Sequence, residues 1–138
     1  RWHSVTGVQT CALPISIAQG ILTGKFGPKP AFKEGDIRPN VVLFDPEVYP
    51  HLYAATEELK QIAVETGRDL IHLVIQWTAA QPGIDSVLVG ARNAKQVREN
   101  VAAFDTEVAP AVLERMTAIS NEAVTHVPDT GNIFRYYP

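Results

Sequence analysis

A short apolar run at residues 84–89 constrains the fold of this chain more than any other feature. It is only six residues long, is rich in β-branched side chains, and lies between two helical patterns, which together predict a buried strand. Strands that alternate with helices pair in parallel through right-handed crossovers. The apolar stretch at residues 16–22 is the other expected strand. Because a parallel sheet needs more strands and helices on both faces, the sequence predicts part of a larger α/β domain.

Apolar residues recur at spacings of three and four in four further segments, which predicts four helices. The first spans residues 48–65, and Asp69 is a plausible N-cap for the second. Asn93 can cap the third, and Pro110 suits the first turn of the fourth. The residues expected to face the core are Leu52, Ala55, Leu59, Ile62, Thr66, Leu70, Leu73, Val74, Trp77, Val97, Val101, Phe104, Leu113, Met116 and Ile119.

Composition narrows the functional classes. The 138 residues include 12 Lys plus Arg and 15 Asp plus Glu, so the basic excess typical of nucleic-acid binders is absent from the sequence. The apolar runs are far shorter than the roughly 20 residues of a membrane helix. A single cysteine, Cys11, allows no intramolecular disulfide and no cysteine-based zinc site. We therefore expect a cytoplasmic protein without a metal, a nucleic-acid partner or a membrane partner.

The N-terminal segment differs from the rest. Residues 5–15 resemble the in-frame translation of a sequencing-adapter oligonucleotide, and they lack the basic start and continuous apolar core of a secretory signal. We expect residues 1–15 to be non-native, so that the natural sequence begins near Ser16. Segments of this kind are excluded from fold reasoning.

The most informative chemistry lies where the strand at 84–89 gives way to a helix, in the run GARNAKQVREN. Gly90 would let a ligand approach the backbone closely, and the helix that follows offers N–H groups and a partial positive charge to an anion. Arg92 adds a fork of donors suited to phosphate. Gln96, Glu99 and Asn100 lie along the same side of the helix, where they could bind an adenine edge. Spacing alone leaves two alternatives open, a phosphate site and a well-capped surface helix.

The same run resembles the NADP-binding motif near the C-terminus of aldo/keto reductases. The run AQGILTGKF at residues 18–26 is similar to the segment after the seventh barrel strand of that family, which follows the cofactor pyrophosphate. In the loop at residues 25–46, Arg38 resembles an arginine that clamps the cofactor phosphate in some relatives. The resemblance therefore implies NADP(H) as cofactor. The cofactor-binding residues it implies are Ile17, Ala18, Gly20, Lys25, Arg38, Gly90, Arg92, Gln96, Glu99 and Asn100.

The family fold is a (β/α)₈ TIM barrel of about 250 residues, so residues 16–138 are expected to form its C-terminal part, with about the last two strands and their helices. The catalytic Asp, Tyr, Lys and His of the family lie in earlier strands, and no catalytic residue is assigned here. We expect this chain alone to be inactive.

The resemblance implies an NADPH-dependent oxidoreductase that reduces a small aldehyde or ketone by hydride transfer. The alternative is a cofactor-sensing regulatory subunit, because the branch it most resembles includes potassium-channel β subunits as well as bacterial enzymes. A P-loop hydrolase is excluded, since only three residues separate Gly20 from Gly24, where that motif has four, and Phe26 cannot ligate magnesium. The sequence leaves the oligomeric state open.

Overall fold

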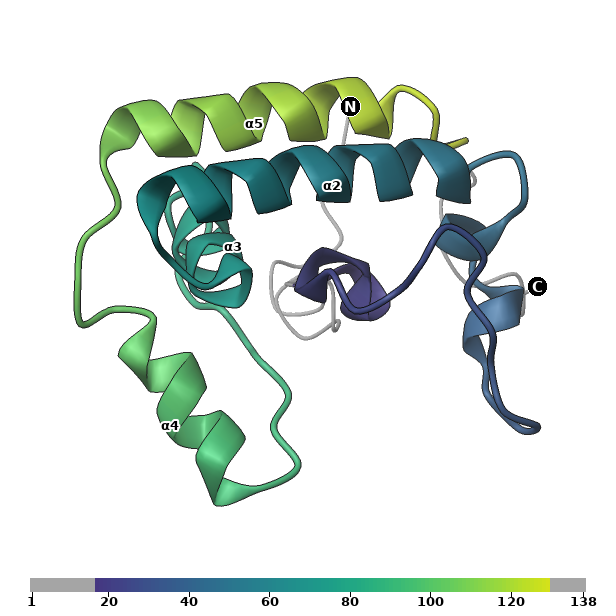
Figure 1. The fold of residues 1–138 in the computed structure, drawn as a ribbon, viewed down its shortest axis with the longest axis horizontal. Coiled ribbons are helices and arrows are strands. Elements are labelled where there is room, and N and C mark those ends of the chain that lie inside the picture. Colours follow the sequence, from purple (N-terminus) through teal and green to yellow (C-terminus); the bar gives the residue numbers. More distant parts are fainter. Residues whose placement is uncertain (1–16, 130–138) are drawn as a thin grey trace.

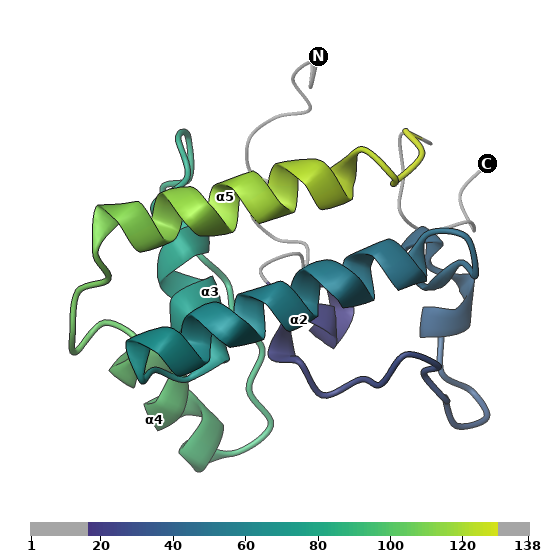
Figure 2. The same cartoon turned by 45° about the horizontal axis from the view of Figure 1, so that its top comes forward.

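Helices α2 and α5 lie side by side and antiparallel in the computed structural model, which describes residues 17–129 (Figure 1). Helix α3 lies against both of them, and α4 lies apart from them, close to α3 (Figure 2). The expected non-native segment at residues 1–15 lies outside the described residues. The elements are the 3₁₀ helices η1 (Ala18–Thr23), η2 (Arg38–Asn40) and η3 (Val42–Phe44), and the α-helices α2 (Tyr49–Thr66), α3 (Leu70–Ala79), α4 (Ala94–Ala102) and α5 (Pro110–Val124).

The main core joins α2, α3 and α5. Leu59 and Ile62 of α2 pack with Leu73 of α3 and Met116 of α5, and each of these side chains is at most 4% exposed. Burying a side chain of this size stabilises a fold by about 1.5–3 kcal/mol. Trp77 adds a polar contact, because its Nε1 donates to Thr117 Oγ1 at 2.9 Å. The inward faces predicted for these three helices are thereby confirmed.

The predicted helix boundaries largely hold. Gly67 ends α2 with a left-handed φ of 64°, a conformation that glycine adopts without strain. Asn93 caps α4, since its Oδ1 accepts from the Gln96 backbone N–H at 2.9 Å. Pro110 begins α5. Asp69 occupies the N-cap position of α3, but its side chain accepts no capping hydrogen bond.

The predicted strands are wrong for the part of the chain that the structure describes, where no residue belongs to a strand. Residues 84–89 form an irregular segment in which Ile84 is 37% and Leu88 53% exposed. The residues expected to end the earlier strand instead begin η1. A strand forms only where a neighbour satisfies its N–H and C=O groups, and no described segment pairs with these two. The described residues therefore form helices joined by irregular segments, with no barrel strand among them.

The apolar face predicted for α4 is also exposed. Val97, Val101 and Phe104 were expected to face the core, but each is more than half exposed. The exposure of this face follows from the missing strand, because the irregular segment at residues 84–89 forms no sheet on which α4 could pack. None of the helices in residues 17–129 is long and apolar enough to cross a membrane.

The predicted loop at residues 25–46 is ordered around a second core. Phe26, Phe32 and Phe44 meet edge to face, with ring centroids 4.9–5.8 Å apart, and Phe44 stacks on Tyr49. The Tyr49 hydroxyl donates to the Gly27 carbonyl at 2.7 Å. The loop is thereby fastened to the first turn of α2.

Gln76 of α3 ties the end of α4 to the main core. Its amide nitrogen donates to the carbonyls of Ala103 and Thr106, and its Oε1 accepts from the Val108 backbone N–H at 3.0 Å. The side chain is almost completely buried. A buried amide that satisfies backbone groups in this way fixes the turn between α4 and α5.

Gln76→Ala is expected to lower the free energy of unfolding by about 2–4 kcal/mol, because it leaves buried backbone groups without partners. Urea denaturation of the full-length gene product measures the change. The matched control is Gln61→Ala on the exposed side of α2, expected to change stability by less than about 0.5 kcal/mol. Equal losses in the two variants would show that Gln76 does not hold this turn.

Candidate functional site

The backbone at the start of η1 is strained. Ala18 and Gln19 have left-handed φ angles of 46° and 56°, and Gly20 follows with 93°. Residues with a Cβ adopt this conformation at a cost of about 1–2 kcal/mol each. The turn is closed by the Gly20 N–H, which donates to the Ile17 carbonyl at 2.8 Å. Strain of this kind clusters at ligand-binding segments, and here it falls on residues expected to follow a pyrophosphate.

Lys25 folds back over this turn. A Cβ added at Gly20 would lie 3.2 Å from both Cε and Nζ of Lys25, so a glycine leaves room for the lysine. The Lys25 ammonium also lies 4.9 Å from the centroid of the Phe26 ring. Although much of the side chain stays exposed, partial loss of hydration at its end lowers the pKa of Lys25.

Two other cations act on the charge of Lys25. After the loss of hydration, the positive charges of Arg38 and Arg92 lower the pKa of Lys25 further, and the carboxylate of Asp36 opposes them. Lys25 and Arg38 both come from the 25–46 loop, and Arg92 comes from the segment before α4, far away in the sequence. An excess of positive charge in one place is suited to an anionic ligand.

Arg38 is held by a carboxylate and two aromatic rings. Its Nε donates to Asp36 Oδ1 at 2.8 Å, and its Nη2 donates to Asp36 Oδ2. The guanidinium carbon lies 5.3 Å from the centroid of Phe26 and 4.9 Å from that of Phe32. The hydrogen bonds from Arg38 lower the pKa of the Asp36 carboxyl from 3.8 to about 2.

The N-terminus of α4 is well capped, which is compatible with both alternatives for this segment, a phosphate site and a capped surface helix. Arg92 is exposed, and its backbone N–H donates to Gln96 Oε1 at 2.7 Å. A Cβ added at Gly90 would meet no atom within 4 Å, so the space beside this glycine is open. The predicted Asn93 cap therefore exists, and the Arg92 side chain stays exposed to solvent.

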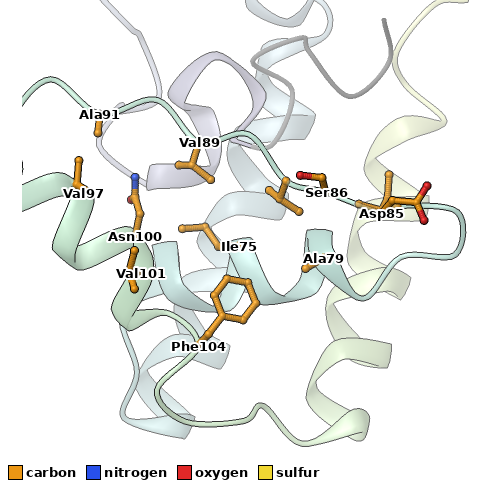
Figure 3. Close-up of a pocket in the computed structure, with 12 residues that line it drawn as sticks. Ile75, Ala79, Asp85, Ser86, Val89, Ala91, Val97, Asn100, Val101 and Phe104 are labelled. Carbon is orange, nitrogen blue, oxygen red and sulfur yellow. The ribbon is translucent and has the colours of Figure 1, made fainter. Parts of the chain in front are cut away.

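The remaining predicted site residues on α4 do not converge. Glu99 pairs with Lys95, whose Nζ lies 3.5 Å from Glu99 Oε1. Asn100 borders a groove of about 530 Å³ between α3, residues 84–91 and α4, where it stands beside Val97 and Ala91 (Figure 3). The groove is lined mostly by apolar side chains, among them Phe104 and Ile75. Of the ten predicted residues, Gly20 lies beside the Lys25 side chain, and the charges of Arg38 and Arg92 act on Lys25.

Sequence reasoning missed Asp36, Phe26 and Phe32 as parts of this site. The signal for Asp36 was its place two residues before Arg38, a spacing at which aspartate bonds the backbone N–H ahead of it. That bond is present at 3.0 Å. The two rings carried no such signal, because their contact with Arg38 depends on how the loop folds.

The donor set fits a ligand that carries several phosphates. Among the described residues, the charges that shift the pKa of Lys25 are those of two guanidinium groups and one carboxylate, so positive charge is in excess there. Arginine and lysine are the side chains that proteins use for phosphate. The open space beside Gly90 leaves the capped end of α4 accessible.

Comparison with known proteins identifies the family. The profile of the aldo/keto reductase family matches residues 6–121, so this chain belongs to that family. Over 107 residues it is 32% identical to a probable voltage-gated potassium channel subunit beta of Oryza sativa subsp. japonica, and 31% identical to one of Arabidopsis thaliana. Each match covers 75% of this chain and 33% of the relative.

A bacterial relative is similar to a shorter part of the chain. The aldo-keto reductase YhdN of Bacillus subtilis (strain 168) is 32% identical over 83 residues, which are 59% of this chain and 25% of that protein. The chain thus spans a third or less of the length of these relatives. The resemblance to the channel-subunit branch and its bacterial relatives is confirmed.

The Asp36 carboxyl is expected to titrate at about 2, and Arg38→Ala should return its pKa toward 3.8. Because the pKa is lowered in the folded state, the stabilising effect of this pair is present above pH 3.8 and is lost as the pH falls through about 2. The carboxyl carbon chemical shift, followed by NMR, measures the titration. The control is Arg115→Ala, which removes an arginine on α5 that pairs with Glu65 of α2, and it should leave the pKa of Asp36 unchanged. An Asp36 midpoint near 4 in the unmodified protein would contradict the pairing.

Proposed function

We propose that the full-length protein is an NADPH-dependent oxidoreductase that reduces small aldehydes or ketones, and that this chain binds the phosphate-bearing end of the cofactor. The proposal rests on membership of the aldo/keto reductase family, together with the positive charges of Arg38 and Arg92 that act on Lys25. Like charges repel one another, and an anion between them offsets that repulsion by attracting both. A dinucleotide with a diphosphate and a 2′-phosphate supplies such anions.

The three cations divide naturally between two phosphate groups. Arg92 lies at the capped N-terminus of α4, where the helix dipole adds to its charge, and this suits the 2′-phosphate. Lys25 lies beside the strained turn at Gly20, and the charge of Arg38 acts on Lys25, which suits the diphosphate. Gln96, through its bond to the Arg92 backbone, holds the start of the helix.

The adenine would lie along α4. Asn100 has a half-buried amide at the edge of the groove, and amides can donate to and accept from a purine edge. Glu99 can reach the same ligand once its solvent-exposed contact with Lys95 is given up, since exposed pairs of this kind contribute at most about 1 kcal/mol.

NADPH, when bound, supplies the hydride for carbonyl reduction. This chain's own residues bind the cofactor, and the catalytic groups and most of the substrate pocket belong to other parts of the protein. The proposed substrate class, a small carbonyl compound, follows from membership of the aldo/keto reductase family.

The second candidate is a regulatory subunit whose bound cofactor reports redox state to a partner. It is favoured by the similarity of this chain to two plant proteins described as probable voltage-gated potassium channel subunits beta. The cation cluster would serve either function. The distinction therefore depends on catalysis and not on binding.

The full-length gene product is expected to oxidise NADPH when given small aldehydes or ketones. The loss of absorbance at 340 nm measures the reaction, and the same protein without a carbonyl compound is the control. NADPH binding without turnover over a panel of such compounds would favour the regulatory function instead.

Arg92→Ala is expected to weaken NADPH binding by roughly 10- to 150-fold. The loss of a charge-assisted hydrogen bond of this kind costs about 1.5–3 kcal/mol, and each 1.4 kcal/mol is a factor of ten in affinity. NADH has no 2′-phosphate and should bind the variant nearly as well as the unmodified protein. Fluorescence titration gives both dissociation constants for both proteins.

Arg98→Ala is the matched control, because it removes the same charge from an exposed position on α4. It should leave the preference for NADPH over NADH nearly unchanged. An equal loss of NADH and NADPH affinity in Arg92→Ala would show that Arg92 supports the fold alone and does not bind the 2′-phosphate.

A further inference from the structure

We propose that Asp36 is a positioning residue for anion binding: it fixes the guanidinium of Arg38 against Phe26 and Phe32, with the end of the guanidinium turned to the diphosphate of the ligand. The inference rests on the proposed function and deepens it, since it adds a residue that bears the same charge as the ligand. Asp36 is expected to act only through Arg38.

Asp36 holds both the backbone and the side chain of Arg38. Its Oδ1 accepts from the Arg38 backbone N–H at 3.0 Å and from Nε at 2.8 Å, and its Oδ2 accepts from Nη2. This geometry uses one side of the guanidinium. An arginine has five N–H donors, and the three that remain, on Nη1 and Nη2, make no hydrogen bond among the described residues.

The aromatic rings fix the plane of the same group. Phe26 and Phe32 lie within 5.3 Å of the guanidinium carbon and meet each other edge to face at 5.8 Å. Both also pack on Phe44, which is buried in the second core. The surface under Arg38 is therefore anchored in the core of the loop.

Partial exposure leaves the site open to a ligand. The Arg38 side chain is 26% exposed and that of Asp36 17%, so the pair is neither buried nor freely solvated. An arginine that is already ordered loses less conformational entropy when it binds a ligand than a free one does, by about 0.5–1.5 kcal/mol per side chain in general.

Two roles of Asp36, repulsion of the ligand by its charge and positioning of Arg38, predict opposite changes in anion affinity when its carboxylate is removed. A carboxylate beside a phosphate site repels the ligand, so if its charge alone mattered, Asp36→Asn would tighten anion binding. If Asp36 positions Arg38, the same substitution weakens binding, since the asparagine NH₂ cannot accept from Nη2 and the guanidinium is freed. The sign of the change separates the two.

The test measures NADPH and inorganic pyrophosphate dissociation constants for the full-length gene product. Asp36→Asn is expected to weaken both by about 2- to 10-fold, which corresponds to the ordering of one long side chain. Glu34→Gln is the matched control, because it removes one exposed carboxylate from the same loop. It should leave both constants unchanged or slightly lower.

A double-mutant cycle with Arg38→Ala shows whether Asp36 acts through Arg38. In the Arg38→Ala background, Asp36→Asn should cause no further loss and can produce a small gain, because only its negative charge is then removed. A loss of equal size in both backgrounds would show a general structural role and would overturn the inference. Tighter or unchanged binding by Asp36→Asn alone would overturn it as well.

The outcome for the proposed function is separate. If Arg92→Ala loses NADPH selectively while Asp36→Asn binds normally, the proposed function stands and the inference fails. If the unmodified protein does not bind NADPH, the proposed function fails, and the pyrophosphate titration still tests Asp36. Absence of pyrophosphate binding in the unmodified protein overturns the inference too.

Discussion

The position of α4 depends on one buried side chain, Gln76. Helix α4 exposes its apolar face, with Val101 65% exposed, so it has little hydrophobic surface to hold it against the core. The Gln76 amide replaces that contact by bonding Ala103, Thr106 and Val108, just beyond the C-terminus of α4. Because α4 is rigid, an anchor at one end also places the other end, where Arg92 lies.

The part of the proposed site around Lys25 depends on a backbone conformation that is locally unfavourable. Ala18 and Gln19 adopt left-handed backbone angles, and Lys25 lies beside the next residue, Gly20, where the charges of two arginines act on it. Each of these features is destabilising by itself, through strain or through repulsion between like charges. The second core, built from the aromatic rings of the 25–46 loop, supplies the packing that holds them in place. Such an arrangement is stabilised further by an anion, which is why it supports cofactor binding.

The parts of this structure that depend on neighbours in sequence were predictable. Asn93, Gly67 and Pro110 end or begin helices through local backbone chemistry, and the stripe that includes Ile62 faces the core as its spacing requires. Residues 84–89 were not predictable in the same way. Their apolar pattern favours a strand. A strand forms only if another segment pairs with it, and no segment among residues 17–129 does so.

The family motif names candidate residues of the proposed site, but it does not specify the contacts of their side chains. Lys25 and Arg38 were named from a resemblance and Arg92 also from its place before a helix, and the charges of both arginines act on Lys25. The pairing of Glu99 with Lys95 and the role of Asp36 depend on side-chain geometry that no spacing rule specifies. Charge that opposes the ligand is also easily overlooked when a sequence is searched for basic residues.

The most direct measurement for the central claim is a structure of the full-length gene product with NADP⁺ bound. The 2′-phosphate is expected to lie within hydrogen-bond distance of the Arg92 guanidinium, at the N-terminus of α4. The diphosphate is expected to lie beside Lys25 and Arg38. A cofactor whose phosphates lie away from all three cations, or one that is bound in a different part of the protein, would contradict it.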